Sequence, residues 1–150
     1  MEEKTTYELD KMLENGTVGN MSSFFSENKD SMLEGDRPFY DYMKSTIQGR
    51  IKLADLFHIA DMSERYGGRI LRMETHTTDR DIILRLCIAG QFNLAETNKA
   101  LKLYGMNELY SKDKRDACII MAIHRRIYDF KKINDILSEQ KLEPLHVYEG

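Results

Sequence analysis

The sequence has few of the residues that interrupt helices or cross-link a chain: its 150 residues include two prolines, two cysteines and no tryptophan. It also lacks the run of about 18 apolar residues that a membrane-spanning helix needs, so we expect no association with a membrane. The first ten residues, MEEKTTYELD, are acidic and do not follow the basic and then apolar order of a signal peptide. These absences favour a globular protein of the cytoplasm.

Signatures of catalysis, metal binding and nucleotide binding are missing as well. Neither a GxGxxG motif nor a GxxxxGKS/T motif occurs. Cys87 and Cys118 stand in apolar runs without CxxC spacing, so we interpret both as reduced core residues. The four histidines are scattered without metal-ligand spacing: His58, His76, His124 and His146. We therefore expect that the protein is not an enzyme and that it binds no metal and no cofactor.

Charge is distributed unevenly along the chain. Residues 1–41 contain ten acidic and four basic side chains, a net charge of −6. Residues 42–150 contain fifteen acidic and eighteen basic side chains, a net charge of +3. A mildly basic body behind an acidic N-terminal part is compatible with binding DNA through one face.

Apolar residues recur at helical spacing along most of the chain, and the alternation typical of strands is nearly absent. Phe39, Tyr42, Met43 and Ile47, for example, follow an i, i+3, i+4, i+8 pattern that Gly49 ends. The pattern predicts about eight helices, no strand and no internal repeat. The fold class is therefore expected to be all-α.

Capping signals mark several of the predicted helix boundaries. Asp79 precedes the strongly apolar segment DRDIILRLCIAG as a helix N-cap. Asn93 and Glu96 have the spacing of a capping box, with Asn in place of Ser or Thr, and Gly105 ends the helix that they begin.

Two predicted helices in the middle of the chain, at about 52–60 and 63–71, are separated only by Asp61 and Met62. A joint of this length makes the two helices cross steeply, as in a helix-turn-helix. In the first helix we expect inward-facing residues at Leu53, Leu56 and Phe57, and in the second Ile70 is expected to anchor the helix to the core. Ser63 is a suitable N-cap for the second helix.

This layout resembles the lambda-repressor-like, or XRE-type, helix-turn-helix family over residues 39–103. The matching positions are Leu56–Phe57, Met62–Ser63, Tyr66, Ile70 and the helix that follows at 79–90. Asp61 stands where the family usually has Gly, and Asp tolerates the left-handed conformation that the turn requires. The whole chain is similar to small helix-turn-helix proteins of Firmicutes with helical N- and C-terminal extensions.

The resemblance implies a five-helix core flanked by an N-terminal helix pair and two C-terminal helices. We expect an acidic N-terminal helical extension at 1–36, a helix-turn-helix domain at 37–105 and a C-terminal helical extension at 106–150 packed on it. The implied function is a transcriptional regulator that binds double-stranded DNA through a recognition helix at about 63–72, as a homodimer.

Arginine is the best reader of guanine, so the second helix supplies the main candidates for base contacts. Basic residues around it are candidates for phosphate contacts. The expected DNA-binding residues are Ser63, Glu64, Arg65, Tyr66, Gly67, Arg69, Arg72, Lys52, Arg50 and His76. Two adjacent glycines inside a helix are unusual, and they indicate that DNA or a neighbouring helix excludes a side chain there.

A second hypothesis is a protein-interaction adaptor that retains the helix-turn-helix scaffold but does not bind DNA. It is favoured by the acidic N-terminal part and by Ile51, Lys52 and Leu53, which stand where many family members have a phosphate-binding Gln or Ser. In either case the N- or C-terminal helical extension is the candidate surface for a protein partner.

Overall fold

The structure, a computed structural model, describes residues 6–14, 20–27 and 37–148. These ranges contain nine α-helices and no strand, which confirms the predicted all-α class. The chain divides into two units, Met1–Asp36 and Arg37–Gly150. Within the described ranges, no helix has the length and apolar character needed to cross a membrane.

The N-terminal unit contains two short helices, α1 (Thr6–Glu14) and α2 (Met21–Glu27). No residue of α1 is buried. In α2, the Asn20 side chain accepts a hydrogen bond from the Ser23 N–H at 2.7 Å, and Phe24 is buried with its ring edge-on to Phe25. A helix of this length depends on such local contacts, because isolated short helices are marginal in water.

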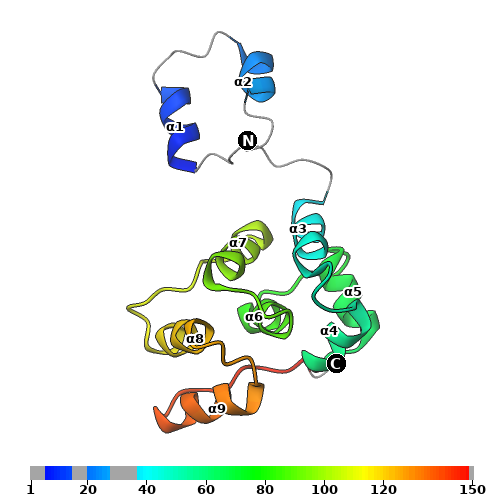
Figure 1. Cartoon of the computed structure of the whole chain (residues 1–150), viewed down its shortest axis with the longest axis vertical. Helices are drawn as coiled ribbons and strands as arrows, with labels where there is room; N and C mark the ends of the chain where they lie inside the picture. The colour runs from blue at the N-terminus through cyan, green and yellow to red at the C-terminus, as the bar shows by residue number, and fades with distance from the viewer. Residues whose placement is uncertain (1–5, 15–19, 28–36, 149–150) are drawn as a thin grey trace. The chain divides into compact units, whose positions relative to one another are not determined.

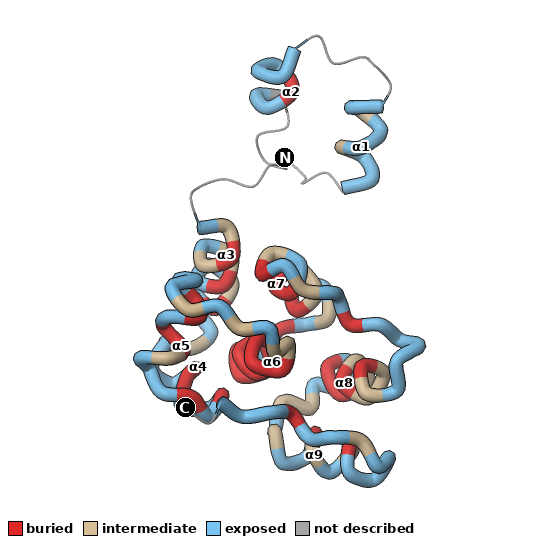
Figure 2. Tube along the Cα trace, turned by 180° about the vertical axis from the view of Figure 1, so that it is seen from behind, coloured by how far each residue is buried: buried red, intermediate tan, exposed pale blue. Residues whose placement is uncertain are grey.

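The second unit is built around one central helix, α6 (Arg80–Ala89), of which every residue from Asp81 onward is buried. Figure 1 shows the other helices of this unit arranged around α6, and Figure 2 shows that α6 is buried along its length. The surrounding helices are α3 (Pro38–Ile47), α4 (Leu53–Ile59), α5 (Glu64–Leu71), α7 (Leu94–Tyr104), α8 (Lys114–His124) and α9 (Phe130–Glu139). Helix α6 contacts α4 and α7, α3 contacts α5 and α7, and α8 contacts α7 and α9.

The predicted helix caps are present. Asp79 accepts a hydrogen bond from the Asp81 N–H at the start of α6. Asn93 and Glu96 form the complete capping box of α7, and Gly105 ends that helix with φ +91°. These boundaries depend only on neighbouring residues, which is why the sequence could predict them.

Three consecutive helix pairs share one type of junction, a regularity that is not visible as a sequence repeat. The pairs are α4–α5, α6–α7 and α8–α9. Two residues after the first helix of each pair stands a residue with positive φ, and the apolar residue that follows it donates its N–H to the carbonyl five residues back. The residues are Asp61 and Met62, Gln91 and Phe92, and Arg126 and Ile127. The same arrangement also ends α7 and α9, at Gly105–Met106 and Lys141–Leu142, so it is the common way in which helices of the second unit end.

One predicted core position lies elsewhere. Leu53 was expected to face inward with Leu56 and Phe57, but it is 36% exposed, whereas Leu56 is fully buried. Leu53 is the first residue of α4 and lies at the edge of the core, where it lines surface hollows.

Candidate nucleic-acid interface

Helices α4 and α5 are joined by a turn that positions the start of α5 firmly. Asp61 has φ +60°, the left-handed conformation expected at this position. Met62 is buried, and its N–H donates to the Phe57 carbonyl at 3.0 Å. Ser63 caps α5 by accepting a hydrogen bond from the Tyr66 N–H at 3.1 Å, as predicted.

Helix α5 has an inner and an outer side. On the inner side, Ile70 and Leu71 are almost fully buried against the core. On the outer side, Arg65, Arg69 and Arg72 are exposed and lie one helical turn apart, at i, i+4 and i+7. We call this exposed side of α5, defined by Arg65, Arg69 and Arg72, the arginine face.

The two adjacent glycines have different surroundings. A Cβ atom at Gly67 would lie only 2.3 Å from Cδ1 of Phe57, so a neighbouring helix excludes a side chain here. A Cβ atom at Gly68 would meet only the end of the Arg72 side chain, with Nη1 at 3.0 Å. Gly67 therefore lies on the packed side of α5, and Gly68, which is also buried, lies at the edge of the arginine face beneath the movable Arg72 side chain.

The three cations of the arginine face differ in their partners. Arg72 forms an ion pair with Glu74, with Nε 3.0 Å from Oε1. The hydrogen bond with Glu74 raises the pKa of Arg72, and the same bond lowers the pKa of Glu74. Arg65 and Arg69 form no ion pair with any described residue, so their guanidinium groups are available to an anionic ligand.

The remaining predicted contacts lie at different places around this face. Glu64 is exposed in the first turn of α5, and Lys52 is exposed at the start of α4. Arg50 is held away from α5 by a bidentate ion pair with Glu96, at 2.6 and 3.1 Å, which raises the pKa of Arg50. His76 is exposed, and its ring is stacked on the ring of Tyr104.

Tyr66 has a partner that the sequence did not reveal. Its ring stacks on that of Tyr148 with centroids 3.5 Å apart and planes 2° from parallel. Burial raises the pKa of Tyr66. Because Tyr148 lies on the C-terminal segment, far from α5 in the sequence, no local pattern could have predicted this contact.

The segment that carries Tyr148 is anchored by hydrogen bonds to Asp81 and Arg85 of α6 and to Arg115 of α8, which forms an ion pair with Asp81. Arg115 of α8 donates two hydrogen bonds to the Asp81 carboxylate, at 2.8 and 2.7 Å. Burial raises the pKa of Asp81, but the hydrogen bonds from Arg115 and from the His146 N–H lower it more, so the pKa lies below its ordinary value. The almost fully buried Arg85 also donates to the carbonyls of Leu145 and His146.

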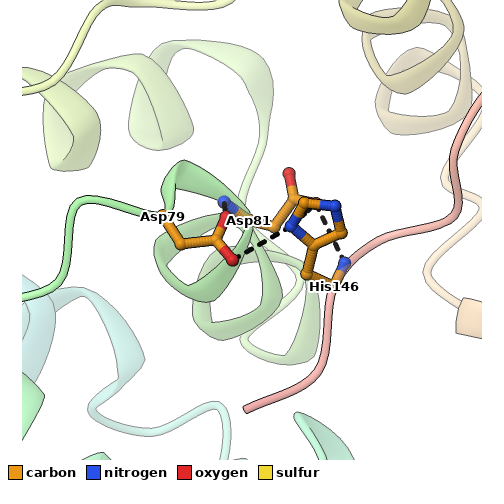
Figure 3. A group of neighbouring side chains, drawn as sticks. All are labelled: Asp79, Asp81 and His146. Carbon is orange, nitrogen blue, oxygen red and sulfur yellow. Dashed lines mark hydrogen bonds and ion pairs between the residues drawn. The ribbon is translucent and has the colours of Figure 1, made fainter. Parts of the chain in front are cut away.

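This anchor brings together Asp79, Asp81 and His146, whose ligand atoms lie within 4.8 Å of one another. Figure 3 shows the His146 side chain facing the two aspartates at the start of α6. One Asp79 oxygen caps α6, and the other lies 3.0 Å from His146 Nδ1. Both Asp81 oxygens bind Arg115. These contacts account for the cluster as an attachment point of the C-terminal segment.

The cysteines agree in part with their interpretation as core residues. Both are free thiols; Cys87 is buried, whereas Cys118 is half-buried. Burial raises the pKa of the Cys87 thiol far above its ordinary value.

Comparison of the sequence and structure with protein-family models, curated proteins and solved structures gave no match.

Proposed function

We propose that this protein is a transcriptional regulator that binds double-stranded DNA through a lambda-repressor-like helix-turn-helix, with residues 63–72 as the recognition helix. The observation that carries the proposal is the arginine face, on which Arg65 and Arg69 have no ion-pair partner among the described residues. The order of helices α3 to α7, with a tight turn between the second and third of them, also supports it.

The chemistry of this surface suits a DNA major groove. The planar guanidinium forks of Arg65 and Arg69 match the O6 and N7 acceptors of guanine. The Ser63 hydroxyl and the N-terminus of α5 are positioned for a phosphate, because unpaired N–H groups and the helix dipole favour an anion there. Lys52 at the start of α4 supplies a second phosphate contact.

We further propose that the protein binds DNA as a homodimer. A single module of this size covers only one half-site, and paired half-sites one helical turn apart are the usual arrangement for this motif. The molar mass of the protein on its DNA, measured by light scattering, distinguishes one copy per site from two.

The function is tested by fluorescence anisotropy with a labelled duplex that covers the region upstream of the protein's own gene, measured over a salt series. We expect tight binding at low salt and weaker binding as salt rises, because phosphate contacts release counterions. The double variant Arg65→Ala plus Arg69→Ala should lose more than about tenfold in affinity, since each bidentate base contact contributes about 1–3 kcal/mol.

A matched control removes two other exposed cations. Lys131 and Lys132 lie in the first turn of α9, and the variant Lys131→Ala plus Lys132→Ala changes the net charge by the same amount. We expect it to bind almost as the wild type does. If the two double variants lose affinity equally, the binding is a non-specific electrostatic attraction between the protein and DNA. If the wild type does not bind at low salt, the proposed function is refuted.

The alternative is a protein-interaction adaptor on the same scaffold. Two of the candidate DNA-binding cations, Arg50 and Arg72, are already neutralised by Glu96 and Glu74, which favours this alternative. It predicts negligible DNA affinity at all salt concentrations. It also predicts a stable complex with another protein, which purification from cell extract followed by mass spectrometry would identify.

A further inference from the structure

A hollow with a volume of about 260 Å³ lies between α4 and α5. Its apolar lining consists of Leu53, Ala54 and Phe57 from α4 and Leu71 from α5, and the aromatic side chain of Tyr40 from α3 also lines it. Glu64 and Arg72 contribute its polar lining. The hollow is several times larger than the volume of a water molecule, about 30 Å³.

The hollow borders the arginine face on the side of Arg72, which is part of its lining. Gly68 also lines it, and Gly68 lies three residues after Arg65 and four before Arg72. Residues with this spacing share one side of a helix. A ligand bound along the arginine face, with Arg65 and Arg72 on either side of Gly68, would therefore lie beside the hollow.

The nearest contacts do not require a glycine at position 68. The three atoms nearest to a Cβ atom built there all belong to the flexible Arg72 guanidinium, at 3.0, 3.5 and 3.6 Å. Alanine would favour the helix at this position. What the glycine does provide is an open path into the apolar hollow when Arg72 moves aside.

Arg72 is able to move because its contacts are at the surface. Its side chain is 40% exposed, and that of its partner Glu74 is 49% exposed. An exposed ion pair of this kind contributes little stability, so a DNA phosphate competes readily with Glu74 for the guanidinium. Movement of Arg72 toward a phosphate would uncover Gly68.

We infer that the hollow at Gly68 receives the 5-methyl group of a thymine when α5 lies in the major groove. This inference rests on the proposed function. The thymine methyl is the apolar group that base pairs present in the major groove, and contact with apolar side chains is how proteins read it. The apolar walls, and the arginines that hold DNA beside them, fit this ligand.

The test begins with a pool of random-sequence DNA duplexes from which the protein selects its preferred site. In the selected duplex, each thymine is replaced in turn by deoxyuridine, which lacks only the methyl group. We expect one thymine per half-site at which the replacement lowers affinity about fourfold, the effect of burying one methyl group. Replacement at the other thymines should leave affinity unchanged.

Protein variants then connect this thymine to the hollow. Gly68→Leu fills the hollow, and we expect it to bind the thymine and deoxyuridine duplexes equally, with lower affinity for the thymine duplex. Gly68→Ala should reduce the fourfold ratio. It remains informative if the leucine variant does not fold, because the atoms nearest to its added methyl group belong to the flexible Arg72 side chain. Ala95→Leu, which creates the same side chain at an exposed position of α7, should keep the full ratio.

The outcomes separate this inference from the proposed function. If no sequence is enriched and no duplex binds at low salt, the proposed function fails and the inference fails with it. If a site is selected but no deoxyuridine replacement changes affinity, or if Gly68→Leu keeps the fourfold ratio, the inference is refuted and the DNA-binding function stands.

Discussion

Gly67 and Gly68 are neighbours in α5, but alanine at the two positions is expected to change stability in opposite directions. At Gly67 the new methyl would lie 2.3, 2.6 and 2.9 Å from three ring atoms of Phe57, which is only 4% exposed. The ring cannot move without disturbing the core, and overpacking of this kind costs about 1–3 kcal/mol. At Gly68 the methyl would lie 3.0 Å from the end of the flexible Arg72 side chain, which can move at little cost.

Both substitutions gain the same helix propensity, about 1 kcal/mol for glycine to alanine. This gain cancels when the two variants are compared, so the difference between them measures the overpacking alone. We expect Gly68→Ala to be more stable than the wild type by up to about 1 kcal/mol. We expect Gly67→Ala to be less stable than Gly68→Ala by about 1–3 kcal/mol.

The measurement is urea unfolding followed by far-ultraviolet circular dichroism, with the free energy of unfolding extrapolated to water. A double-mutant cycle identifies the cause: in a Phe57→Leu background, which removes the ring, Gly67→Ala should lose most of its penalty. If Gly67→Ala is as stable as Gly68→Ala, or if its penalty persists without the ring, the assignment of Gly67 to the packed side of α5 is refuted.

Three further predictions concern charge and thiol chemistry. Glu74→Gln removes the carboxylate that competes with a DNA phosphate for Arg72, so it should raise the DNA affinity in the anisotropy assay at every salt concentration; unchanged or lower affinity contradicts it. The folded-state pKa of Asp81 lies below the unfolded value of about 3.9, so its stabilisation is complete above that pH and is lost as pH falls through the folded pKa. Asp81→Asn should lower the free energy of unfolding at neutral pH by about 1–3 kcal/mol and flatten its decline in acid; an equally steep decline rules this out. In the native protein Cys118 should react with an aromatic disulfide reagent well before the buried Cys87, and equal rates would argue against the burial described.

Features that depend on neighbouring residues could be predicted from the sequence. The N-caps Ser63 and Asp79, the capping box of α7 and the left-handed turn residue Asp61 lie where the sequence indicated. Each requires a particular side chain within a few residues of a helix end, and this requirement is visible in a single sequence.

Features that depend on distant residues could not be predicted. The stacking of Tyr148 on Tyr66 and the ion pair of Arg115 with Asp81 join residues that lie on different elements and far apart in the sequence. The repeated junctions were also missed, because the backbone accepts residues as different as Asp61, Gln91 and Arg126 at the left-handed position. Because several residue types adopt the left-handed conformation at these positions, the junctions share no residue that would identify them in the sequence.

The paired and unpaired cations connect the candidate interface to the proposed homodimer. On α4, α5 and their flanking residues, the cations without an ion pair among the described residues are Lys52, Arg65 and Arg69. With about 0.9 released counterions for each phosphate contact, three such cations per copy give a weak electrostatic contribution. When two copies bind one DNA, the electrostatic contribution doubles because the second copy brings the same three cations. The spacing of the half-sites then fixes the distance between the two arginine faces. The small number of free cations therefore favours two bound copies, and within each copy the discrimination between base pairs would come from Arg65, Arg69 and the hollow at Gly68.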